Sequence, residues 1–159
     1  MTNISQATSD EAITRCYPVL RQLRPSLQPG QLIPAVRRME AHGFRLAYLE
    51  EGGEIRAVAG YRITEMLRTG PMLEIDDLVT DAATRSGGYG RKLLEWLVAE
   101  ALVHGCSVVE LDSAVHRFDA HRFYYREGMH ILGYHFSLGV GPEARPSMWG
   151  ISRERSEQW

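Results

Sequence analysis

The sequence is poor in cysteine, in net charge and in long apolar runs, and each shortage excludes a class of protein. Its two cysteines, Cys16 and Cys106, match no metal-binding spacing, so we expect two reduced thiols. The formal net charge of -2 provides no basic surface, so we expect neither a nucleic-acid partner nor a membrane partner. No apolar run approaches the about 18 residues that a membrane span requires.

Leader and metal signatures are missing as well. The opening segment, MTNISQATSDEA, has neither the basic stretch nor the apolar stretch of a signal peptide, so we expect a cytoplasmic protein. No two histidines have the helical spacing, with a nearby carboxylate, that zinc sites use, so we expect no metal.

Hydrophobic residues form 44% of the 159 positions, which is enough for the core of one domain. We expect a single domain over 1–138 and a tail, 139–159, that packs on it. Ser9 or Asp10 can cap a first helix, and Pro18 within that helix predicts a kink or a break. Periodicity and turn residues predict strands at 3–8, 44–50, 54–67, 72–80, 107–113 and 130–138, and helices at 9–23, 31–43 and 119–129.

A further helix follows the glycines at 87–90 and ends before the segment HGC, 104–106. Its apolar residues repeat with the period of a helix and predict one broad buried stripe: Leu93, Leu94, Leu97, Val98, Ala101 and Leu102. The crossover from 72–80 to 107–113 requires parallel pairing, whereas the hairpins before it pair antiparallel. The fold class is therefore α/β (α+β), with a mixed sheet and helices on its faces.

The glycine-rich segment RSGGYG, 85–90, stands between a strand and a helix start. The first turn of a helix has N–H groups without partners, and its dipole attracts anions. Glycines let the loop curl around a phosphate, and Arg85 and Arg91 add charged donors. A tight turn with glycines needed only for sterics is the alternative. The spacing fits neither the Walker loop nor the dinucleotide fingerprint.

Three motifs in register resemble the GNAT superfamily of acetyl-CoA-dependent N-acetyltransferases. RSGGYG fits the signature [RQ]-x-x-G-x-[GA], LEIDDLVTDAAT resembles the fourth strand of the family, and AHRFYYREGM resembles the segment A-x-x-x-Y-x-x-x-G-[FM]. The resemblance implies a mixed, mostly antiparallel sheet of about six or seven strands, with a central splayed parallel pair and about four helices on both faces. It also implies that acetyl-CoA binds as co-substrate, its diphosphate on the loop and its pantetheine arm along the strand. The residues implied are Leu78, Val79, Thr80, Arg85, Ser86, Gly87, Gly88, Tyr89, Gly90 and Arg91, and we add Arg117 as a candidate phosphate contact.

Acetyl transfer to an amine needs a base, because an alkyl ammonium has a pKa near 10.4 and only about 1 in 2,500 is neutral at pH 7. Strict alternation predicts that Glu74 and Asp76 share a strand face with Leu78 and Thr80. Either acid is a candidate for the base, directly or through water. Asp77 is expected on the opposite face, as an anchor for a loop or a helix.

Tyr124 is the candidate acid. It lies four positions before Gly128, where the resembling segment carries the tyrosine that protonates the departing sulfur. The neighbouring Tyr125 points elsewhere around the helix and is expected to pack against other residues.

The leading hypothesis is transfer from acetyl-CoA to a primary amine, by direct attack in a ternary complex. The alternatives are a non-catalytic acyl-CoA sensor, a transferase of another acyl group, and transfer to a hydroxyl group. Acidic residues at the fork suit a cationic acceptor, either a small molecule or a peptide amine. A homodimer remains open, because the sequence favours no role for the tail.

Overall fold

The computed structural model describes residues 1–138 and 140. The chain divides into two compact units, the first covering Met1–Leu111 and the second beginning at Asp112. Among the described residues, no helix is long and apolar enough to cross a membrane. A single domain over 1–138 stays a prediction, and the tail lies almost wholly outside the described residues.

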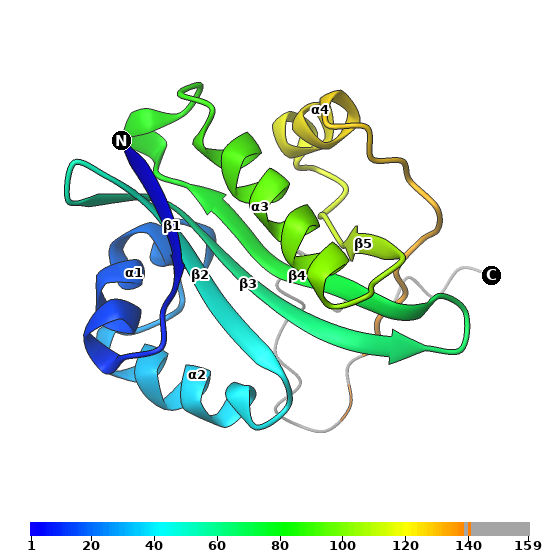
Figure 1. The fold of residues 1–159 in the computed structure, drawn as a ribbon, viewed down its shortest axis with the longest axis horizontal. Coiled ribbons are helices and arrows are strands. Elements are labelled where there is room, and N and C mark those ends of the chain that lie inside the picture. Colours follow the sequence, from blue (N-terminus) through cyan, green and yellow to red (C-terminus); the bar gives the residue numbers. More distant parts are fainter. Residues whose placement is uncertain (139, 141–159) are drawn as a thin grey trace, which may run out of the picture. The chain divides into compact units, whose positions relative to one another are not determined.

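The first unit is built on a five-stranded sheet with strand order β1-β2-β3-β4-β5. β1 to β4 pair antiparallel, and β4 and β5 pair parallel, as the crossover predicted. The central strands β3 and β4 are the longest and contain buried residues on both faces, because helices cover both faces (Figure 1). The strands are Thr2–Gln6 (β1), Phe44–Glu51 (β2), Glu54–Met66 (β3), Gly70–Thr80 (β4) and Val108–Leu111 (β5).

The strand predicted at 130–138 is not formed, so the sheet has five strands instead of six or seven. A strand requires a neighbour that pairs with its N–H and C=O groups. No strand pairs with 130–138 within the described part of the chain, and its large apolar residues are exposed, Tyr134 by 86% and Phe136 by 90%.

The described residues form four α-helices, three that lie between strands in the chain and one that follows β5, in agreement with the about four that the resemblance implied. Ser9 caps the first by accepting a hydrogen bond from the Ala12 N–H, one of the two capping residues expected. That helix runs on through Pro18, so of the predicted kink or break the break is wrong and the kink stays a prediction. The helices are Asp10–Leu23 (α1), Leu32–Glu40 (α2), Tyr89–Val103 (α3) and Phe118–Arg126 (α4).

The sheet of the first unit has two apolar faces. α1 and α2 cover one, and α3 lies across the other (Figure 1). The face under α1 and α2 is called face A here, and its sheet residues are Phe44, Leu46, Ile55, Val58 and Val79. On α3 the buried stripe is narrower than expected, because Val98 is 43% exposed and Leu102 is 71% exposed.

A β-bulge interrupts the pairing of β3 with β4. Gly60 pairs with Asp77 and Tyr61 pairs with Ile75, so Asp76 is an extra residue without a partner on β3. The position of Gly60 requires glycine, because a Cβ there would lie 2.7 Å from the Phe44 ring and 2.8 Å from Asp77 Oδ2. The bulge therefore forms where a glycine admits an aromatic ring and a carboxylate from its neighbours.

Candidate active site

The loop between β4 and α3 is a built turn rather than a loose connection. Asp81 accepts a hydrogen bond from the Ala83 N–H and begins a short 3-10 turn, Ala82–Thr84. The Gln22 side chain fixes the same turn, donating to Asp81 Oδ1 at 3.0 Å and accepting from the Ala82 N–H at 2.9 Å. The amide of Gln22 lowers the pKa of Asp81, and the positive charges of Arg56 and Arg85 lower it further.

After this turn the backbone twice adopts left-handed geometry. Ser86 has φ +68° and Gly88 has φ +79°, and Gly88 is the N-cap residue of α3. At Gly87 a Cβ would lie 2.6 Å from the Tyr89 ring and 3.1 Å from the Thr84 carbonyl oxygen. The glycines therefore meet a conformational need at Gly88 and a spatial one at Gly87.

The N-terminus of α3 differs from that of α1. α1 has the Ser9 cap and acidic residues in its first turn, whereas α3 has no side-chain cap and no acidic residue there. The first N–H bonded within α3 is that of Lys92, which donates to the Gly88 carbonyl at 3.1 Å. Helix geometry leaves the N–H groups of Tyr89 and Gly90 without an intrahelical acceptor. An anion fits this end of α3, because no side-chain cap occupies the N–H groups and no acidic residue of the first turn offsets the helix dipole.

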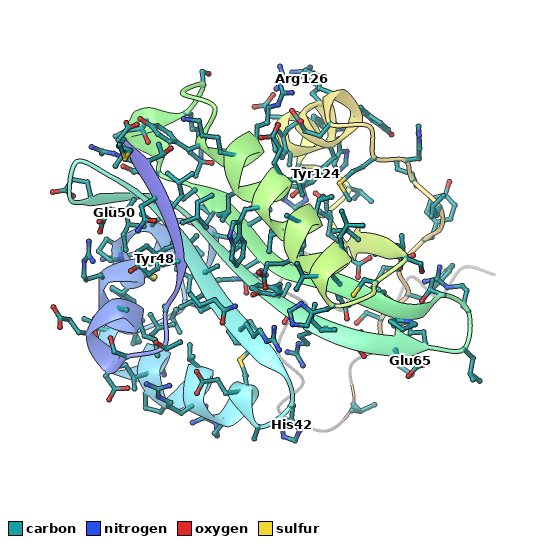
Figure 2. The ribbon with its side chains drawn as sticks, viewed as in Figure 1. His42, Tyr48, Glu50, Glu65, Tyr124 and Arg126 are labelled. Atoms are coloured by element: carbon teal, nitrogen blue, oxygen red, sulfur yellow. The ribbon has the colours of Figure 1, made fainter. Side chains whose placement is uncertain are left out.

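The Tyr89 side chain is held away from that helix end. Its hydroxyl donates a hydrogen bond to the Glu51 carboxylate at the end of β2, and this bond raises the pKa of the phenol. Lys92 Nζ lies 5.9 Å from the centre of the Tyr89 ring. These contacts attach the start of α3 to the β2–β3 hairpin, so the loop has a fixed position on the sheet. Tyr48 and Glu50 mark β2 close to the same hairpin (Figure 2).

The C-terminal half of β4 has a free edge. Pairing with β5 ends at Ile75 opposite Leu111, while β4 continues to Thr80. Beyond Ile75, the edge of β4 that faces away from β3 has no strand partner among the described residues. Leu78 and Thr80 lie along this edge and are half-buried. Its backbone N–H and C=O groups can pair with an extended ligand as with an additional strand.

Two acids at the bulge are paired with two arginines. Arg62 Nε donates to Asp76 Oδ2 at 2.7 Å, and the Arg62 guanidinium lies 5.8 Å from the centre of the Phe44 ring. Arg24, at the C-terminal end of α1, donates from Nε to Asp77 Oδ1 at 2.7 Å and from Nη2 to the Asp76 carbonyl at 3.1 Å. Burial raises the pKa of Asp77, although the charge of Arg24 opposes the shift.

The bulge corrects the predicted facing of these acids. Val58 and Val79 point to face A, so Ala59 and Leu78, which pair with each other, point to the opposite face. Asp76 and Asp77 both reach arginines on face A, so the two acids lie on one face and Leu78 on the other. Glu74, opposite Arg62 on β3, shares face A with Asp76, as predicted. Strict alternation fails because one extra residue in β4 resets the count.

Tyr124 lies in the second unit, on α4 together with Arg126 (Figure 2). Burial raises the pKa of its phenol, and the nearby charge of Arg117 opposes the shift. The His121 ring contacts the Ala114 carbonyl through Nε2 at 2.9 Å and so connects α4 to the preceding segment. Tyr125 is 54% exposed, so the expectation that it packs against other residues is wrong.

The arginines of this site were not found by sequence reasoning. Arg24 and Arg62 belong to other elements than β4, and no spacing rule connects them with Asp76 and Asp77. A signal was available at Gly60, because an isolated glycine inside a strand marks a bulge or a close approach. The catalytic and cofactor roles given to individual residues remain predictions, and no metal-binding cluster of histidine, cysteine, aspartate or glutamate occurs in the described part of the chain.

Comparison with known proteins gives one consistent result. Residues 10–129 match the model of the Acetyltransferase (GNAT) family. The chain is 37% identical over 128 residues to the uncharacterized N-acetyltransferase YhdJ of Bacillus subtilis, covering 78% of this chain and 88% of that protein. It is 44% identical over 55 residues to an aminoalkylphosphonate N-acetyltransferase of Salmonella typhimurium, covering 35% and 36%.

A solved structure shows the same fold. Glucosamine-6-phosphate N-acetyltransferase from Arabidopsis thaliana superposes with a TM-score of 0.70 at 23% identity, covering 87% of this chain and 97% of that one.

Proposed function

The chain belongs to the GNAT acetyltransferase family and is an acetyl-CoA-dependent N-acetyltransferase, and we propose that it acetylates a small primary amine by direct attack in a ternary complex. Two neighbouring features carry the proposal. The N-terminus of α3 follows glycines and has no side-chain cap, and the edge of β4 continues beyond the end of β5. A diphosphate and an extended pantetheine arm need these two features. Relatives with this fold include enzymes named for glucosamine-6-phosphate and aminoalkylphosphonate, which supports a small-molecule acceptor.

The start of α3 would hold the diphosphate. The N–H groups of Tyr89 and Gly90 point along the helix axis, and Gly88 provides no side chain that competes for them. Arg85 and Arg91 are placed on the same loop and at the first turn, where a guanidinium can add charge-assisted hydrogen bonds. Ser86 and Gly87 shape the turn that leads to this helix end.

The pantetheine arm would lie along the free edge of β4. Backbone groups of Leu78, Val79 and Thr80 can pair with its amides as they would with another strand. The thioester would then reach the bulge, where pairing with β5 has ended. An N–H group at the end of such an edge can hold the carbonyl oxygen as negative charge develops on it.

The base would be Asp76 rather than Glu74. Asp76 is the bulge residue, next to the point where β4 and β5 stop pairing, whereas Glu74 lies within the paired region. The Arg62 hydrogen bond fixes the Asp76 carboxylate, and 22% of that side chain remains exposed to an incoming amine. The ammonium loses one proton to this carboxylate, directly or through water, before nitrogen attacks the carbonyl carbon.

The acid would be Tyr124. As the C–N bond forms, the C–S bond breaks and the sulfur leaves as a thiolate, which would take up one proton from Tyr124. The nitrogen would release its second proton to water, from which the phenol would regain its own. Burial raises the pKa of this phenol, so its hydroxyl is protonated at neutral pH and can donate to the departing sulfur. Tyr124 would therefore stabilise the departing sulfur with an O–H hydrogen bond and deliver its proton. Arg117 would lie near a phosphate of the coenzyme.

Calorimetry and a thiol assay test the proposal together. Titration with acetyl-CoA is expected to give one binding event. When the protein and acetyl-CoA are incubated with a panel of primary amines, free thiol is expected only with those amines that are acceptors. Absence of binding heat together with absence of thiol release would refute the proposed function. Binding without release for any amine would instead support a non-catalytic sensor.

A further inference from the structure

Arg62 has donors that form no hydrogen bond within the described part of the chain. Its guanidinium is fixed by the 2.7 Å bond from Nε to Asp76 and by the Phe44 ring, and 32% of the side chain is exposed. Among the described residues, Arg62 forms this one side-chain hydrogen bond, and its terminal nitrogens Nη1 and Nη2 donate none. An arginine held in one orientation with both terminal nitrogens available can bind an oxyanion through two parallel hydrogen bonds.

Arg24 adds a second guanidinium at the same bulge. Its Nε and Nη2 are bonded to Asp77 and to the Asp76 carbonyl, and Nη1 has no acceptor in the described part of the chain. The two arginines carry as much positive charge as Asp76 and Asp77 carry negative charge. Face A therefore offers a carboxylate and directed N–H donors side by side, with no net charge among these four groups.

The two guanidinium groups beside Asp76 let this cluster discriminate between amines. A purely cationic amine can approach Asp76 but also meets two guanidinium groups, which repel it. An amine that carries its own oxyanion satisfies both partners, because its ammonium pairs with Asp76 and its oxyanion with Arg62. Specificity then arises from attraction of one class and repulsion of the other.

We propose, on the premise of the acetyl transfer described above, that the acceptor is a small amine bearing a carboxylate, phosphonate or phosphate group. Its ammonium binds at Asp76 and its oxyanion binds the terminal nitrogens of Arg62. Polyamines and other polycations are poor acceptors at this face. The inference concerns groups of the first unit alone.

Matched acceptors test this inference directly. One pair is β-alanine and β-alaninamide, another is 2-aminoethylphosphonate and its dimethyl ester, and spermidine represents the polycations. For wild type we expect kcat/KM to be higher for the anionic member of each pair by about 10- to 100-fold, as a charged hydrogen bond provides. Arg62→Gln should bring the two members of each pair close to equality, and Arg62→Lys should give an intermediate ratio.

The ratio of kcat/KM between the two members of a pair shows whether Arg62 binds the oxyanion or only positions Asp76. If Arg62 only orients Asp76, Arg62→Gln lowers both members of a pair alike and their ratio stays unchanged, which would overturn the inference. Arg38→Gln is the control, since Arg38 is an exposed arginine on α2 that forms no hydrogen bond or ion pair with Arg24, Arg62, Asp76 or Asp77. Thermal unfolding of each variant shows whether it is folded.

Equal rates for anionic and neutral amines in wild type would also overturn the inference about Arg62. The proposed acetyl transfer would still be supported in that case, because both amines would release thiol. Failure of every amine, together with no heat on titration with acetyl-CoA, would overturn the proposed function and this inference together.

Discussion

Arg24, the C-cap residue of α1, forms a 2.7 Å ion pair with Asp77 of β4. The Asp77 side chain is only 14% exposed, so the pair joins a helix end to the strand that carries the candidate base. Burial raises the pKa of Asp77, which means that folding favours the protonated carboxyl. The contribution of Asp77 to the stability is therefore complete at a pH below about 3.9, the pKa of its carboxyl in the unfolded chain. It is lost as the pH rises through the higher pKa that this carboxyl has in the folded protein.

Arg24→Gln should therefore destabilise the protein more at neutral pH than at acidic pH. Without its partner, the ionised Asp77 stays buried, and we expect a loss of about 1–3 kcal/mol near pH 7 that shrinks toward pH 4. Urea unfolding of wild type and variant at both pH values measures the difference. Arg38→Gln should leave the stability unchanged at both, and a pH-independent loss in Arg24→Gln would contradict the assignment.

Gly60→Ala should disturb the bulge. The new Cβ would lie 2.7 Å from the Phe44 ring and 2.8 Å from Asp77 Oδ2, so the ring or the carboxylate must move. We expect a loss of about 1–3 kcal/mol in the free energy of unfolding. Gly30→Ala is the control, because nothing lies within 4 Å of a Cβ there. Equal stability of the two variants would show that the close approach at Gly60 is dispensable.

Gly88→Asp should separate folding from coenzyme binding. Aspartate tolerates left-handed geometry better than most residues, and its carboxylate at the N-cap would occupy the donors of α3. We expect stability to change by less than about 1 kcal/mol and acetyl-CoA affinity to fall by about 10-fold or more, since the new carboxylate competes with the diphosphate.

The matched control for that change lies at the other end of the same helix. Gly105 has φ +69°, and a Cβ there meets nothing within 4 Å. Gly105→Asp should leave the dissociation constant for acetyl-CoA, measured by calorimetry, unchanged. A Gly88→Asp protein that binds acetyl-CoA as tightly as wild type would place the diphosphate elsewhere.

Tyr124→Phe should slow the chemical step. Loss of the hydroxyl would remove the proposed hydrogen bond to the departing sulfur, and we expect kcat to fall by about 100-fold while acetyl-CoA affinity stays within a few-fold. Tyr125→Phe, at the exposed neighbouring position, should leave kcat unchanged. Stopped assays of thiol release measure both, and equal rates for the two variants would remove Tyr124 from the mechanism.

Local signals in the sequence predicted most of the fold. Ser9 caps α1, the glycines precede α3, and the hairpins and the crossover set the strand order as expected, because each depends on residues close in sequence. The α3 stripe was predicted too broad. Periodicity identifies the apolar side of a helix, but only packing decides how much of that side the sheet covers, and Leu102 lies beyond the covered part.

The arrangement of the candidate site depended on contacts between distant residues. Arg24 and Asp77 are 53 positions apart, and their pairing follows from the packing of α1 on the sheet. The facing of Asp76 depended on a bulge, whose position is set by what β3 offers at Gly60. The strand predicted at 130–138 was wrong for a related reason. Alternation shows that a segment can pair as a strand, but it does not show that a second strand lies beside it.

The bulge also has a consequence for the length of the chain. Tyr61 pairs with Ile75 and Gly60 with Asp77, so a strand shortened by removing Asp76 would keep both of these pairings and give a continuous ladder. The proposed base thus occupies the one position in the paired part of β4 that has no partner on β3, so the ladder itself does not require a residue there.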